Sequence, residues 1–104
     1  MRTLSDFEGR AIRLTEERRQ HIVEHPEMAG LEAAIEDTLR RPATVIQSLS
    51  DPDARLYYRY YVGTGVGDKF LCVVVKLTGA DGFVVTAYLT DRVKKGRQTW
   101  PREA

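Results

Sequence analysis

The feature that most constrains the fold is a change of pattern near residue 43. Before it, apolar residues recur at helical spacing. After it, short runs rich in β-branched and aromatic residues alternate with turn residues. These runs predict strands at residues 44–49, 56–62, 70–77 and 83–90. Because the connections are short enough for hairpins, we expect an antiparallel meander.

Two helices are predicted ahead of the strands. Thr15 stands before two glutamates, as an N-cap hydroxyl does at the positive end of a helix. Pro26 limits that helix to about residues 16–25. An apolar stripe with helical spacing over 31–39, followed by Pro42, predicts the second helix. The expected fold class is α+β, with two N-terminal helices packed on one face of a four-stranded antiparallel sheet.

Length and composition restrict the domain count and the cellular setting. The chain has 104 residues, of which 42% are hydrophobic and 30% charged, so we expect one domain over residues 1–104. The single Cys72 has no partner in the chain, which favours a reducing, cytoplasmic location. No apolar run approaches the roughly 18 residues of a spanning helix. The acidic N-terminus lacks the apolar stretch of a signal peptide, so we expect no membrane partner.

The charge is distributed unevenly. Residues 1–54 hold 7 basic and 11 acidic side chains, a net charge of −4, whereas residues 55–104 hold 9 basic and 4 acidic side chains, a net charge of +5. The C-terminal half is therefore the predicted surface for an anionic partner.

Strand alternation predicts a polar, aromatic sheet face. If the more apolar residues of each strand face the helices, the opposite face gathers Tyr57, Arg59, Tyr61, Lys76, Thr86 and Tyr88. On this interpretation Arg59 and Lys76 neutralise a phosphate, and the rings of Tyr57 and Tyr61 stack on bases. The alternative is that the two cations only keep an exposed sheet soluble.

The only histidines, His21 and His25, are four residues apart and lie on the same side of the first predicted helix. This spacing suits two metal ligands, but no third ligand is evident, and we predict no metal site. Imidazole also exchanges protons near neutral pH, so either residue is a candidate general acid or base. The alternative is that one packs at the helix end and the other is solvated.

A basic segment follows the last predicted strand. Arg92, Lys94, Lys95 and Arg97 precede Trp100, a composition that suits RNA contacts and equally suits a solvated tail. The glycines at 63–67 precede a strand instead of a helix, so they indicate a hairpin loop and no nucleotide-binding loop. No nucleophile elbow and no glycosidase carboxylate pair is evident.

Four stretches resemble a known group of nucleases. They are His21–Met28, Leu56–Arg59, Val73–Lys76 and Val85–Thr90. In these stretches the chain is similar to the phage-type nucleases of the barnase/EndoU/colicin/RelE-like fold. The resemblance implies helices followed by a four-stranded antiparallel sheet. Many members are metal-independent ribonucleases, often toxins held by an antitoxin or domains carried on phage proteins.

The resemblance implies a small metal-independent endoribonuclease of the toxin type. Attack of a ribose 2′-hydroxyl on its own 3′-phosphate would leave a cyclic phosphate, with no cofactor. The implied catalytic residues are His21, His25, Arg59, Lys76, Thr86 and Tyr88. The predicted RNA-binding residues are Tyr57, Tyr61, Arg92, Lys94, Lys95 and Arg97. RNA is the expected partner, together with a cognate antitoxin or immunity protein. The alternatives are a non-catalytic RNA- or protein-binding module on the same fold and, less favoured, a metal hydrolase that uses the two histidines.

Overall fold

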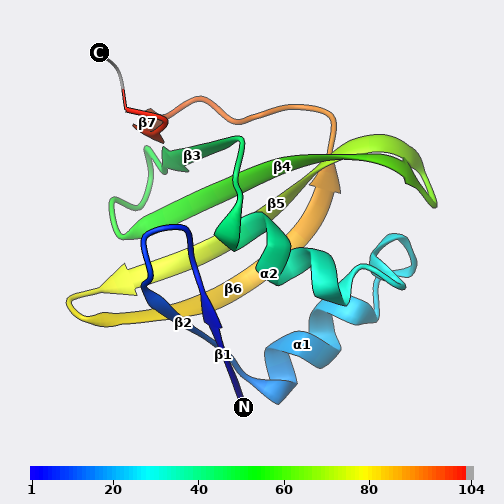
Figure 1. Cartoon of the computed structure of the whole chain (residues 1–104), viewed down its shortest axis with the longest axis horizontal. Coiled ribbons are helices and arrows are strands. Elements are labelled where there is room, and N and C mark those ends of the chain that lie inside the picture. The colour runs from blue at the N-terminus through cyan, green and yellow to red at the C-terminus, as the bar shows by residue number, and fades with distance from the viewer. Residues whose placement is uncertain (103–104) are drawn as a thin grey trace.

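A computed structural model, which describes residues 1–102, contains one seven-stranded mixed sheet with two α-helices on one face (Figure 1). The strands are β1 (Arg2–Ser5), β2 (Ala11–Leu14), β3 (Thr44–Gln47), β4 (Ala54–Thr64), β5 (Gly67–Thr78), β6 (Asp81–Thr90) and β7 (Arg97–Trp100). The helices are α1 (Glu16–Val23), the 3-10 helix η1 (Pro26–Met28) and α2 (Glu32–Arg40). The order across the sheet is β1-β2-β6-β5-β4-β3-β7.

The prediction of a four-stranded antiparallel sheet behind two N-terminal helices was wrong. The four predicted runs form β3 to β6, but β1, β2 and β7, of four residues each, widen the sheet at both edges. The β1–β2 hairpin also precedes the helices, and β2 pairs with β6 in parallel at Arg13 and Phe83. Four residues carry too little alternation to indicate a strand, and the parallel contact depends on tertiary packing.

The helices begin where local chemistry favours it. The Thr15 hydroxyl caps α1 by accepting a hydrogen bond from the Arg18 backbone N–H at 3.2 Å. Pro26 then opens η1, since its fixed φ suits a first helical position. Within the described residues, no helix has the length and apolar character needed to cross a membrane.

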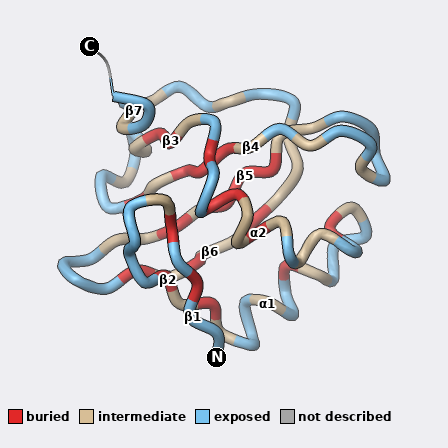
Figure 2. Tube along the Cα trace, viewed as in Figure 1, coloured by how far each residue is buried: buried red, intermediate tan, exposed pale blue. Residues whose placement is uncertain are grey.

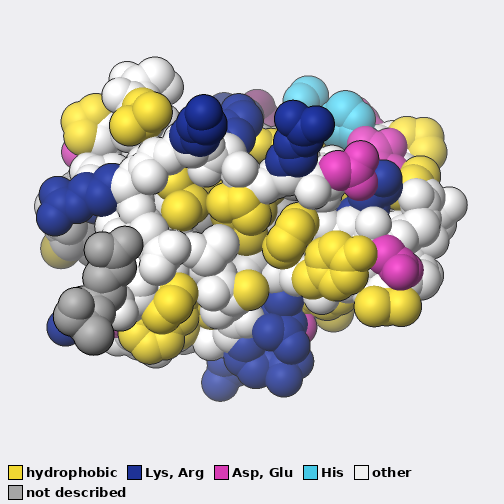
Figure 3. All heavy atoms as spheres, turned by 90° about the horizontal axis from the view of Figure 1, so that it is seen from above, with side chains coloured by type: hydrophobic (Ala, Val, Ile, Leu, Met, Phe, Trp, Pro, Cys, Tyr) yellow, Lys and Arg dark blue, Asp and Glu magenta, His cyan; other side chains and the backbone are white. Residues whose placement is uncertain are grey.

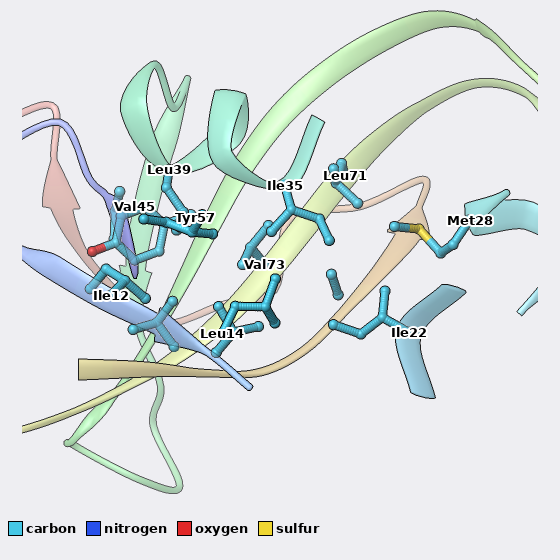
Figure 4. Close-up of a cluster of buried hydrophobic side chains, with 14 residues drawn as sticks. Ile12, Leu14, Ile22, Met28, Ile35, Leu39, Val45, Tyr57, Leu71 and Val73 are labelled. Carbon is cyan, nitrogen blue, oxygen red and sulfur yellow. The ribbon is translucent and has the colours of Figure 1, made fainter. Parts of the chain in front are cut away.

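The main core lies between the helices and the sheet. Its side chains come from β1 and β2, both helices and the central strands, and Figure 4 shows them pointing toward one another. Figure 2 shows the buried stretches running through the middle of β4, β5 and β6. Ile35 and Leu39 of α2 and Val73 of β5 are all fully buried there.

A second, smaller cluster lies on the sheet face away from the helices, called here the open face. Ile46, Leu56, Tyr58 and Cys72 are buried in it. The chain after β6 packs over this cluster through Val93, and the Lys94 backbone N–H donates to the Tyr58 hydroxyl at 3.1 Å. Both faces of the sheet therefore bury apolar surface.

This second cluster explains why part of the predicted polar face was wrong. Tyr57 and Tyr61 pack in the helix-side core, and Arg59 pairs with Asp37 of α2, so none of the three lies on the open face. Alternation in β4 separates two almost equally aromatic sets, and the open face carries the more apolar one, of which Leu56 and Tyr58 are buried. A register shift in the β5–β6 pairing also breaks alternation, so that Val84 and Ala87 both join the main core.

Candidate anion-binding cleft

A cleft of about 450 Å³ opens on the open face, between the β3–β4 loop, strands β5 and β6, and the segment that follows β6. Its floor is apolar and includes Ile46, Leu56 and Val74. Hydroxyl groups lie around that floor, from Ser48, Ser50, Thr86 and Tyr88. The cleft therefore combines an apolar surface with hydrogen-bonding groups.

Two lysines complete the cleft lining. Lys94 and Lys95 are exposed, and within residues 1–102 neither ammonium group is paired with a carboxylate. Their backbone is held in place: the Lys94 N–H bonds to Tyr58, and Gly96 packs so closely on β3 that an added Cβ would lie 2.5 Å from the Gln47 carbonyl oxygen. The two charges thus sit on an anchored segment, and no carboxylate in the described part of the chain holds their ammonium groups.

The second cluster contains three weakly acidic groups, the Cys72 thiol and the phenols of Tyr58 and Tyr88. The buried Cys72 thiol contacts the phenols of Tyr58 and Tyr88. Burial raises the pKa of all three groups, that of Tyr58 to about 12. The Tyr88 phenol is protonated at neutral pH, as it would be at its ordinary pKa of 10.0, and burial makes it a weaker acid. It can donate a hydrogen bond to a ligand in the cleft.

Among the described residues that line the cleft, Asp51 supplies the one carboxylate. Its Oδ2 lies 3.1 Å from Nζ of Lys76, which projects from β5. The hydrogen bond from Lys76 lowers the pKa of Asp51. Lys76, a predicted phosphate ligand, is thus on the open face, but its ammonium group is paired with the carboxylate of Asp51.

The histidines lie outside the cleft. His21 is exposed on α1, His25 is exposed at the start of η1, and their ring centroids are 6.1 Å apart. Figure 3, a view from above, shows both imidazoles at the upper border of the molecule. The described residues contain no group of three or more His, Cys, Asp or Glu arranged to hold a metal ion.

The predicted site residues of β4 lie apart from the cleft, on the helix side of the sheet. Arg59 donates to the Arg41 carbonyl oxygen at 2.8 Å and lies 3.4 Å from Asp37, and Tyr61 donates to the same Asp37 at 2.8 Å. Burial together with this hydrogen bond raises the pKa of Tyr61 to about 12. Tyr57 is fully buried and donates to Asp6 at 2.7 Å, so no face of its ring is exposed to a base.

The structure therefore divides the twelve predicted site residues. Lys76, Thr86, Tyr88, Lys94 and Lys95 gather around the cleft, whereas Arg59, Tyr57 and Tyr61 lie on the opposite face of the sheet. Arg92 and Arg97 are exposed, and Arg97 borders a separate polar hollow beside β7. Ser48, Ser50 and Asp51 were not predicted as site residues. Ser48 fell within the predicted strand 44–49, and the stretch that holds Ser50 and Asp51 indicated only a turn.

No protein-family model, curated protein or solved structure matches this chain. The resemblance to the phage-type nucleases therefore stays a prediction.

Proposed function

We propose that the protein binds RNA in the open-face cleft and cleaves it as a small, metal-independent endoribonuclease of the toxin type. The observation that carries the proposal is the placement of Lys94 and Lys95, which form no ion pair within residues 1–102, beside the Thr86 and Tyr88 hydroxyls, over an apolar floor. Ammonium and hydroxyl groups bind phosphate oxygens, and an apolar floor suits the face of a base.

The proposed reaction needs charge stabilisation and two proton transfers. The ribose 2′-oxygen bonds to the adjacent phosphorus and loses its proton to a base. The bond to the 5′-oxygen of the next nucleotide then breaks, leaving a 2′,3′-cyclic phosphate and a 5′-hydroxyl. Lys94 and Lys95 stabilise the developing negative charge. The Tyr88 phenol supplies a proton to the leaving 5′-oxygen, which as an alkoxide is more basic than a phenolate.

The resemblance implies His21 or His25 as the base, and both lie outside the cleft lining, across β6 from it, so the cleft residues themselves supply the charge stabilisation and the acid but no base. Strand β6 carries Thr86 and Tyr88 on the cleft wall, while α1 packs against the same strand. The guanidinium of Arg18 on α1 donates to the Val85 carbonyl oxygen at 3.4 Å. In this proposal the enzyme acts in the cytoplasm, and an antitoxin or immunity protein that covers the cleft holds it inactive.

A second candidate function is a non-catalytic RNA-binding module. It is favoured by one observation: the cleft lining contains hydroxyls, a carboxylate and lysines but neither histidine. Such a module would bind RNA with a strong dependence on salt and release no product.

The test is incubation of the purified protein with total RNA and transfer RNA in excess chelator. We expect cleavage products that end in a cyclic phosphate. Lys94→Gln and Lys95→Gln should each weaken RNA binding about tenfold, the size of one charged hydrogen bond. The control Arg40→Gln removes one exposed positive charge from α2, away from the cleft, and should bind RNA almost as the native protein does.

The double variant His21→Ala, His25→Ala separates the two functions. The ribonuclease proposal expects it to bind RNA and to leave the RNA intact. Salt-sensitive binding without cleavage by the native protein would favour the module. Cleavage that the chelator abolishes would contradict the metal-independent mechanism and favour a metal hydrolase. If Lys94→Gln and Arg40→Gln bind RNA equally, the cleft is not the RNA site.

A further inference from the structure

Lys76 of β5 does not itself line the cleft, but its ammonium group pairs with Asp51, which does. We infer that Lys76 Nζ is an additional phosphate-binding position of the cleft, closed in this structure by the Asp51 carboxylate, which occupies the place of a phosphate oxygen. The assignment of RNA as the source of that phosphate rests on the proposed function. The anion site itself rests only on the geometry.

The contact between Asp51 and Lys76 is of a kind that an outside anion displaces. Nζ and Oδ2 are 3.1 Å apart, and each side chain is 39% exposed. Ion pairs this exposed contribute little to stability because water and salt screen them. Carboxylate and phosphate oxygens accept hydrogen bonds from an ammonium group in the same way, so they compete for it.

The loop explains how Asp51 is held at this position. Its Oδ1 accepts from the Asp53 backbone N–H at 3.0 Å, and the Ser48 hydroxyl accepts from the Asp51 N–H at 3.3 Å. Gln47 further fixes the loop by donating to the Pro52 carbonyl oxygen at 2.9 Å. One carboxylate oxygen of Asp51 thus stabilises the turn, while the other forms the ion pair with Lys76.

Because the two carboxylate oxygens have different partners, Asp51→Asn tests the contact with Lys76 alone. Asparagine keeps an oxygen for the Asp53 N–H, so the turn is retained, and it removes the negative charge that holds Lys76. Asp53→Asn is the matched control, because it makes the same change in net charge two residues away. The Asp53 carboxylate forms no hydrogen bond or ion pair with the described residues and does not line the cleft.

The affinity for inorganic pyrophosphate and for a single-stranded oligouridylate is measured in each variant. We expect Asp51→Asn to raise both affinities about fivefold, the upper range for an exposed ion pair. Asp53→Asn should change them less than about twofold, since a solvated charge is screened. For the oligouridylate, the plot of log affinity against log salt should steepen by about 0.7 in Asp51→Asn, the value for one added phosphate contact on a single strand.

The double variant Asp51→Asn, Lys76→Gln shows whether the increase in affinity depends on Lys76. We expect the double variant to have no increase in affinity for either ligand. A gain that persists without Lys76, an equal gain in Asp53→Asn, or no gain for either ligand would each overturn the inference. A gain for pyrophosphate in a protein that does not bind the oligouridylate would support the Lys76 site and contradict the RNA function. Unfolding midpoints of all variants exclude a folding defect as the cause.

Discussion

At the scale of single residues, the same side chain serves different purposes because its surroundings differ. Tyr57 is fully buried and hydrogen-bonded to Asp6, Tyr61 fixes Asp37 at the end of α2, and Tyr88 borders the cleft. All three were candidates for a ligand site on the basis of residue type. Burial and hydrogen-bond partners give Tyr57 and Tyr61 a structural role, whereas Tyr88 remains available to a ligand.

Tyr57→Phe tests this assignment. The Tyr57 hydroxyl donates to the buried Asp6 carboxylate, which also binds the Arg10 guanidinium at 2.8 Å. Loss of a hydrogen bond to a charged group should lower the free energy of unfolding by about 1.5 to 3 kcal/mol, measured by urea denaturation. Tyr60→Phe, at a half-exposed ring of the same strand, should change it by less than about 0.5 kcal/mol. Unchanged stability with lost RNA binding in Tyr57→Phe would contradict the structural role.

At the scale of elements, the segment after β6 builds the cleft because it is anchored at both ends. Tyr58 receives the Lys94 N–H, and Gly96 lies directly against β3. A Cβ at position 96 would collide with the Ile46 side chain and lie 2.5 Å from the Gln47 carbonyl oxygen. The chain at position 96 lies so close to β3 that only glycine fits there.

Gly96→Ala should therefore destabilise the protein by about 1 to 3 kcal/mol, as overpacking does, and should also weaken RNA binding by displacing the two lysines. Thermal unfolding and RNA titration measure the two effects. Gly65→Ala is the control, since no atom lies within 4 Å of its Cβ position and its φ is not positive. Equal stability of the two variants would show that the segment is not held against β3.

The elements also show what sequence patterns can predict. The helix-side stripe of α2 and the long strands β4 to β6 carry enough periodic residues to be predicted near their observed positions. The short strands β1, β2 and β7 do not, since they depend on edges that other strands provide. At the site, the basic segment predicted Lys94 and Lys95, but Asp51 could not be predicted, because its position depends on how the β3–β4 loop folds over β5.

At the scale of the whole molecule, the buried phenols make stability depend on alkaline pH. Burial raises the pKa of Tyr57, Tyr58, Tyr61 and Tyr88 above the ordinary value of 10.0, that of Tyr58 and Tyr61 to about 12. A raised pKa means that the folded state keeps a proton that the unfolded state has lost. The stabilisation is therefore complete below about pH 10 and is lost as the pH rises toward about 12.

The urea midpoint should thus fall steeply between about pH 10 and pH 12, while ultraviolet absorbance shows the phenolates appearing together with unfolding. Tyr58→Phe removes one of these groups, so its midpoint should fall less steeply. A midpoint that stays constant up to about pH 12 would contradict the buried state of the tyrosines.

Amide chemical-shift mapping with a single-stranded oligoribonucleotide shows directly whether RNA binds in the open-face cleft. If it does, we expect the largest shifts at Thr86 and Tyr88 of β6 and at Lys94 and Lys95, and only small ones at Tyr57 and Arg59 on the other side of the sheet. Shifts confined to the helix side, or no shifts at all, would show that RNA does not bind in the cleft.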